Sequence, residues 1–162
     1  MINVLSRPFG SARGLREVLA AFLLVFSGTA YGQTSSDYAV VDGVMIYYAI
    51  LPAEMLRTYP PGSEDARMHG GVPDGKHIHH LQIALFDAGT NMRIDDARVT
   101  AMVAEIGLGG TEKTLEPFQV SDALTYGGYV EFQKRELYEI RVRVVLPERG
   151  RVIEKTFEYR HQ

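Results

Sequence analysis

The sequence predicts an all-β protein, an immunoglobulin-like antiparallel β-sandwich of about seven strands. Three observations support this prediction. Short runs of alternating apolar and polar residues recur after residue 33, at close to the spacing of sandwich strands. Glycine, proline and aspartate separate these runs, as they do in tight turns. The same part of the chain has no apolar stripe long enough for an amphipathic helix.

The first half of the expected domain contains two strands separated by a long loop. The first strand covers residues 43–51, and Pro52 ends or bends it because proline cannot donate a ladder hydrogen bond. Residues 57–75 are polar and rich in Gly and Pro, which predicts a long loop. The second strand covers residues 77–86. The core-facing residues are expected to be Val44, Ile46, Tyr48 and Ile50, then Leu81, Ile83 and Leu85.

The second half contains further strands joined by turn-forming sequences. Residues 87–91 (Asp-Ala-Gly-Thr-Asn) have the composition of a turn, as do residues 147–150 (Pro-Glu-Arg-Gly). The clearest alternation predicts that one strand buries Tyr138, Ile140, Val142 and Val144. The strands of this half are expected at residues 97–105, 111–120, 137–146 and 152–159.

The first 33 residues have the composition of a secretory signal peptide. Three arginines precede an apolar core at residues 18–26, which is too short to span a bilayer. Small residues follow at Ala30 and Gly32, so we expect cleavage near Gly32 and Gln33. The alternative is a membrane anchor that stays attached, which the short apolar core disfavours. Residues 34–162 would then form one exported, periplasmic domain, long enough for a hydrophobic core.

Composition excludes several functions. The chain has a formal net charge of −3, and its predicted leader is basic, so an acidic domain remains that does not suit nucleic acid. It contains no cysteine, so any soft metal ligand must be methionine and any nitrogen ligand histidine. The motifs of serine hydrolases, phosphate loops, zinc proteases and dinucleotide-binding enzymes are absent from the sequence. We therefore do not expect an enzyme.

Four of the five histidines lie in one short segment, with Met68 at its front. Imidazole and thioether both bind copper: a Met/His mixture suits Cu(I), whereas histidines alone suit Cu(II) or Zn(II). Strand alternation would place His77 and His79 on one face and His80 on the other. A site could use His77 with His79, or His80 with groups from elsewhere, including Met68 and His69 brought back by a glycine turn. The competing interpretation is a polar loop without metal.

Residues 114–129 contain a series of spaced residues that matches a known protein family, namely Thr114, Pro117, Ser121, Asp122, Tyr126 and Gly127. By these residues the segment resembles the periplasmic iron-transport proteins, in which a Thr-Phe-Met-Pro-Met stretch leads through Ser-Asp to Gly-Pro-His-Tyr-Gly. His80-Leu81 and Tyr138-Glu139-Ile140 also resemble strand sequences of that family. Its members are small immunoglobulin-like, copper-binding dimers that work beside an iron permease.

The departures from that family concern its metal ligands. Phe118 stands at the family's methionine position and Thr125 at its second histidine position, while a short turn replaces its late histidine-rich loop. Only His80 matches a ligand. The resemblance implies a periplasmic copper- or iron-binding protein that supports metal uptake, with a permease or another periplasmic protein as partner and a homodimer as its assembly. A metal site here would be rebuilt around His80 from Met68, His69, His77 or His79. The alternative is a metal-free accessory module that binds a protein partner.

Overall fold

Eight β-strands make up the domain. The computed structural model describes residues 37–58, 70–120 and 122–162, so the predicted signal peptide, Met68 and His69 lie outside the described residues. A short helix, α1 (Ala53–Leu56), and a 3-10 turn, η2 (Pro147–Arg149), accompany the strands. The strands are β1 (Tyr38–Val41), β2 (Val44–Pro52), β3 (Ile78–Asp87), β4 (Arg98–Glu105), β5 (Glu112–Val120), β6 (Ala123–Glu131), β7 (Leu137–Leu146) and β8 (Arg151–Arg160).

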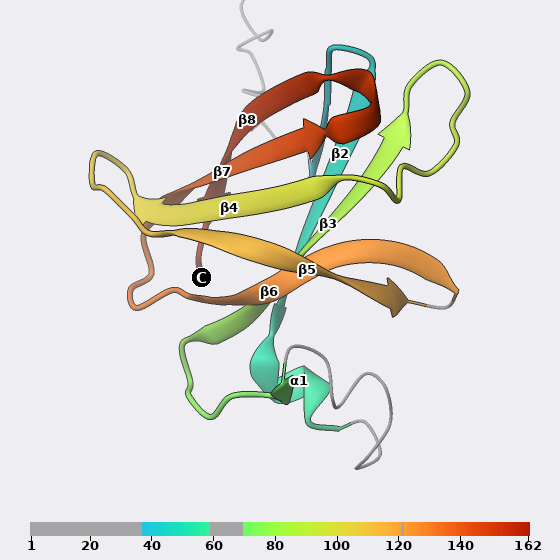
Figure 1. Cartoon of the computed structure of the whole chain (residues 1–162). Coiled ribbons are helices and arrows are strands. Elements are labelled where there is room, and N and C mark those ends of the chain that lie inside the picture. The colour runs from blue at the N-terminus through green and yellow to red at the C-terminus, as the bar shows by residue number, and fades with distance from the viewer. Residues whose placement is uncertain (1–36, 59–69, 121) are drawn as a thin grey trace, which may run out of the picture. The chain divides into compact units, whose positions relative to one another are not determined.

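All neighbouring strands run antiparallel in the order β1-β2-β3-β6-β5-β4-β7-β8. The predicted antiparallel all-β class is therefore confirmed, with eight strands in place of about seven. β5 is the strand at which the sheet folds over on itself. Its residues 112–115 pair with β4, and its residues 116–120 pair with β6. Figure 1 shows β5 running between these two neighbours.

The predicted alternation places the core correctly. Every second residue of β7 is buried from Tyr138 to Val144, and the observed bounds of that strand are those predicted. The same alternation buries Val44, Ile46 and Tyr48 of β2, as expected for a strand with one face toward the core. The core joins residues from both folded halves of the sheet, among them Leu81, Ile83, Leu85, Val99, Leu115, Tyr126, Ile140, Ile153 and Phe157.

Four elements were missed or displaced. β1 was not expected, because the first predicted strand begins at residue 43. β6 contains Gly127 and Gly128, which break the alternation, and no strand was predicted there. The four residues of α1 follow Pro52 and are too few to show a helical period. β3 begins at Ile78, so the predicted strand start at His77 was one residue early, and His77 lies exposed before the strand.

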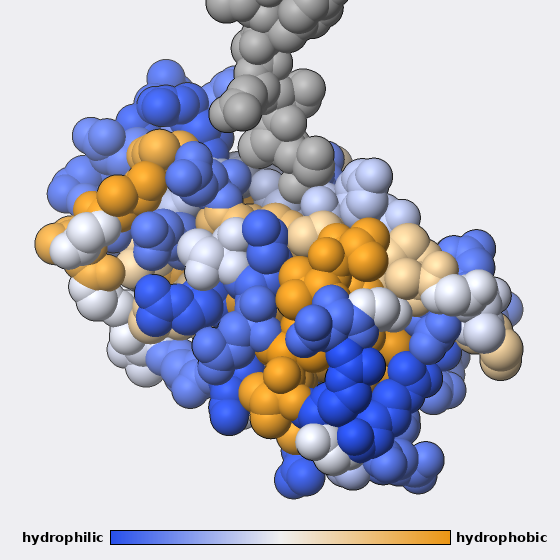
Figure 2. Space-filling model, turned by 90° about the horizontal axis from the view of Figure 1, so that it is seen from above, coloured by the Kyte–Doolittle hydropathy of each residue, from blue (hydrophilic) through white to orange (hydrophobic). Residues whose placement is uncertain are grey.

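The two edge strands are β1 and β8, and they also contact each other. Each edge exposes a large apolar side chain, Val40 on β1 and Val152 on β8. Figure 2 shows hydrophobic residues of one face gathered between hydrophilic ones. Within the described ranges, no helix has the length and apolar character needed to cross a membrane.

Candidate functional site

The start of β3 separates two histidines onto opposite faces of the sheet. His79 contacts the rings of Phe132 and His161, whereas His80 contacts those of Phe118 and Tyr129. The predicted division between His79 and His80 is therefore confirmed, and no single side of the strand holds both. Each histidine is buried, so each belongs to a packed environment of its own.

On the outer face, His80 and Phe118 meet across β6. Their ring centroids lie 5.2 Å apart, although they come from strands on either side of β6. Gly127 makes this contact possible because it has no side chain. A Cβ atom on Gly127 would lie 2.5 Å from Phe118 Cε1 and 2.9 Å from His80 Nε2. The glycine of the matched motif thus has a packing role here.

A small cover lies over the same part of the outer face. Ala53 and Leu56 of α1 pack with Tyr129, whose ring centroid is 5.1 Å from that of His80. Arg57 fixes the cover, since its Nη2 donates to the carbonyl oxygen of Pro73 at 2.6 Å and lies 3.3 Å from Asp74 Oδ1. Burial raises the pKa of the Tyr129 phenol, and the charge of Arg57 opposes that rise. His80 is consequently fully shielded from solvent.

The side chain of Gln82 sets the proton position on His80. Gln82 Nε2 lies 3.1 Å from His80 Nδ1, and an amide nitrogen can only donate. In this arrangement Nδ1 of His80 accepts, so the neutral ring carries its proton on Nε2. Metal binding at Nε2 would move that proton to Nδ1, and Gln82 would have to turn its carbonyl oxygen toward the ring.

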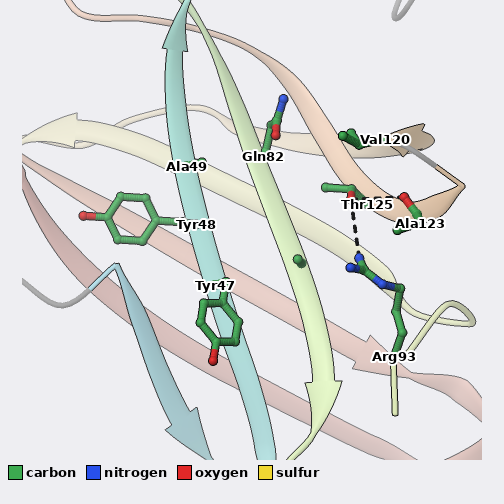
Figure 3. A pocket seen from close by; sticks show the side chains of 9 residues that line it. Tyr47, Tyr48, Ala49, Gln82, Arg93, Val120, Ala123 and Thr125 are labelled. Atoms are coloured by element: carbon green, nitrogen blue, oxygen red, sulfur yellow. Dashed lines mark hydrogen bonds between the residues drawn. The ribbon is translucent and has the colours of Figure 1, made fainter. Parts of the chain in front are cut away.

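An open pocket of about 200 Å³ lies beside this contact on the same face (Figure 3). Thr125, which pairs with Phe118 across the β5–β6 ladder, lines it together with Gln82 and Arg93. The guanidinium of Arg93 stacks over Phe86 at 4.6 Å, and its Nη1 donates to the carbonyl of Leu124 and, at 3.5 Å, to the Thr125 hydroxyl. The pocket is thus apolar in most of its wall, with one arginine at its rim.

The described residues at the outer face supply a single candidate metal ligand, His80. In this part of the chain, no three or more histidine or carboxylate side chains are arranged to hold an ion. At the outer face His80 offers one imidazole, while Phe118 and Thr125 offer neither nitrogen nor sulfur. A copper ion at this place would need ligands besides these residues; the predicted candidates Met68 and His69 lie outside the described residues.

The inner face holds a second group of rings that was not predicted from the sequence. This terminal ring cluster consists of His79, Phe132, Tyr138, Tyr159 and His161. His161 follows the last strand and was not proposed as a ligand. The signal that could have found it is the alternation of β8, because Phe157, Tyr159 and His161 fall on one side of an extended chain.

Together these features describe a small antiparallel β-domain with one buried histidine on its outer face, beneath a helix and loop. Solved structures show the same fold. A copper-bound variant of FetP from uropathogenic Escherichia coli matches with a TM-score of 0.59 and 14% identity, over 78% of this chain and 95% of that one. FetP of the same organism, expressed in the E. coli periplasm, matches with a TM-score of 0.58 and 15% identity, over 78% and 93%.

A DUF4426 family protein from Pseudomonas aeruginosa shares the fold as well, with a TM-score of 0.52 and 12% identity over 76% of this chain and 94% of that one. No protein-family model and no curated protein sequence matches the chain. The expected resemblance to the periplasmic iron-transport proteins is confirmed as a shared fold.

Proposed function

We propose that this chain is an exported periplasmic protein of the FetP type, with an immunoglobulin-like arrangement of its folded sheet. In this proposal it binds a transition metal, copper or iron, and supports metal uptake or delivery. One observation carries the proposal. The three positions matched to the family's ligands converge on one spot, because His80 touches Phe118 and Phe118 lies opposite Thr125. A protein with the same fold is known with copper bound.

In the proposed site, His80 is the anchoring ligand. Met68 and His69 follow it in order of preference, since their segment adjoins the cover formed by α1 and residues 70–78. A thioether and two imidazoles form a donor set that suits copper. Phe118 and Tyr129 would exclude water from the buried imidazole, and Gln82 would orient it through Nδ1. A bound ion would be held for transfer, because ligands on a loop exchange readily.

The test is a titration of the exported protein, without its signal peptide, with Cu(I), Cu(II) and Zn(II) separately. The His69→Ala/His80→Ala double variant should lose the tightest binding step. His77→Ala is the matched control, because His77 is exposed and lies before β3, and it should bind as the wild type does. Far-UV circular dichroism checks that each variant is folded. A double variant that binds as tightly as the wild type contradicts the proposal.

A second candidate is a metal-free accessory module that holds a permease or another periplasmic protein. A specific observation favours it: the carbon atoms of Phe118 fill the space beside His80 that a metal ion would need. The partner would then bind at the exposed edges β1 and β8 or at the loop between α1 and β3. A periplasmic pull-down with the wild type and with a variant lacking residues 59–69 tests the loop. Identical partners for both proteins would exclude the loop as the binding surface.

Self-association is the other interaction to be tested. β1 and β8 stand at the two ends of the strand order and expose Val40 and Val152, and strands at a sheet edge can pair with another chain. In the proposal the protein forms a homodimer through one of these edges. Sedimentation of the wild type beside Val40→Lys and Val152→Lys identifies the edge, because a lysine in the contact should give monomers. Monomeric wild-type protein contradicts a homodimer.

A further inference from the structure

Two histidine rings face each other on the side of β3 opposite to His80. The ring centroids of His79 and His161 lie 4.9 Å apart, with their planes nearly perpendicular at 85°. Phe132 contacts both rings, at 5.2 Å from His79 and at 5.4 Å from His161. Because β3 and the end of β8 supply one histidine each, only the folded chain brings them together.

A backbone carbonyl orients the ring of His79. His79 Nδ1 lies 3.1 Å from the carbonyl oxygen of His77, which can only accept, so Nδ1 carries a proton. The same carbonyl also accepts the backbone N–H of Phe132 at 2.9 Å, which fixes it in place. In the neutral ring, the lone pair is therefore on Nε2. Histidines that bind metals commonly donate their other ring N–H to such a carbonyl.

His161 presents a ring nitrogen that lacks a partner. Its backbone N–H donates to the carbonyl of Glu136 at 3.0 Å, which anchors the residue, and its ring stacks on Phe132. Within the described residues its Nδ1 is buried and has no hydrogen-bond partner. Burial first, and then the charges of His79, Arg135 and His77, lower the pKa of the ring. The buried Nδ1, which has no hydrogen-bond partner within the described residues, is the nitrogen of this ring that a ligand could occupy.

We propose that His79 and His161 form a two-imidazole binding site for a monovalent d10 cation of the Cu(I) type. Metal–imidazole bonds are about 2.0–2.1 Å long, so two nitrogens on one ion lie at most about 4 Å apart. The two rings are nearly perpendicular with centroids 4.9 Å apart, so they would have to turn and move slightly apart to place one nitrogen each on the ion. Cu(I) accepts as few as two ligands, which suits a site where two histidines meet.

The surroundings of the two histidines favour a bound ion of low charge. Aromatic rings line the site, and the guanidinium of Arg135 acts on His161 as a positive charge, so a divalent cation is disfavoured more than a monovalent one. This site is separate from the proposed site at His80, because the two histidines of β3 point to opposite faces. Either site could therefore exist without the other.

The experiment measures Cu(I) binding by competition with a chromophoric chelator under reducing conditions. His161→Phe is the decisive variant, because phenylalanine keeps the stacking on Phe132 and removes both ring nitrogens. It should lose one equivalent of Cu(I) relative to the wild type. The His69→Ala/His80→Ala variant should retain that equivalent, so failure of the site at His80 and failure of this site are distinguished.

Histidine ring nitrogen NMR of the wild type gives a second readout that needs no variant. Cu(I) is diamagnetic, so the ring signals of His79 and His161 should shift together as the ion is added, while the exposed His77 serves as the reference. Equal Cu(I) stoichiometry for His161→Phe and the wild type would overturn the proposal. Unmoved signals of His79 and His161 at saturating Cu(I) would overturn it too, even if the variant failed to fold.

Discussion

Gly127 keeps open the space in which the His80 and Phe118 rings meet, so we predict that Gly127→Ala destabilises the protein. A Cβ atom there would lie 2.5 Å from Phe118 Cε1 and 2.9 and 3.0 Å from two atoms of the His80 ring. Favourable contacts between carbon atoms are about 3.5–4.0 Å long. Both rings would therefore have to move. His80 is fully buried and bonded to Gln82, so Phe118 must yield most.

Overpacking of a well-packed site costs about 1–3 kcal/mol. Replacing glycine also restricts the unfolded chain, which returns about 0.4–1 kcal/mol. The free energy of unfolding of Gly127→Ala should therefore fall by about 1–2 kcal/mol. Small proteins have urea m-values of about 1–3 kcal/mol/M, so the urea midpoint should fall by roughly 0.5–1 M. Urea denaturation followed by far-UV circular dichroism measures this shift.

Gly128→Ala is the matched control at the next residue. A Cβ atom there would lie 3.3 Å from Leu115 Cδ2, the end of a flexible side chain, so the midpoint should change less. Phe118→Leu supplies a second test, because it removes the Cε1 atom that the new methyl group would meet. The loss caused by Gly127→Ala should shrink in that background. An unchanged midpoint for Gly127→Ala, or the same loss in both backgrounds, would refute the reasoning.

Three further predictions concern the site and its supports. The double substitution Phe118→Met/Thr125→His supplies the ligand types that the periplasmic iron-transport proteins have at these positions. Cu(I) affinity should therefore rise at least about tenfold in a chelator competition. Unchanged affinity would mean that the positions do not correspond. Arg149 donates to Asp87 at 2.9 Å and is the largest of the hydrogen-bond contributions that lower the pKa of that carboxyl from 3.8 to about 2. Its stabilising effect is thus present above pH 3.8 and is lost as the pH falls through about 2. Arg149→Gln should move the pKa measured by carboxyl NMR upward, and a midpoint still near 2 would assign the shift to the turn backbone. Tyr126→Phe removes the hydroxyl oxygen that accepts the backbone N–H of Ala97 at 3.0 Å. It should lower the free energy of unfolding by about 1 kcal/mol in the same urea assay. An unchanged midpoint would show that this hydrogen bond adds no stability.

Strands with one buried face could be predicted from the sequence, since alternation is the direct consequence of such burial. β7 shows this best, because its bounds and all four of its core residues from Tyr138 to Val144 were predicted. The opposite directions of His79 and His80 followed from the same rule. The resemblance in residues 114–129 placed Phe118 and Thr125 at the positions of the family's other ligands. Phe118 does contact His80.

The missed features depend on contacts between distant segments. The strand at Gly127 and Gly128 was not predicted because glycine carries no apolar side chain to show alternation, yet Phe118 supplies the ring that covers Gly127. The pairing of His79 with His161 requires β3 and the end of β8 to be placed together. Such proximity is decided by the order of strands in the sheet, which local patterns do not encode.

β5 belongs to both halves of the folded sheet, so a single strand connects the outer site with the core. Leu115 is buried in the core and lies in the part of β5 that pairs with β4, while Phe118, a few residues on, pairs with β6 and touches His80. One continuous backbone therefore joins the two parts of the sheet, and separating them would break the pairing of β5 with β4 or with β6.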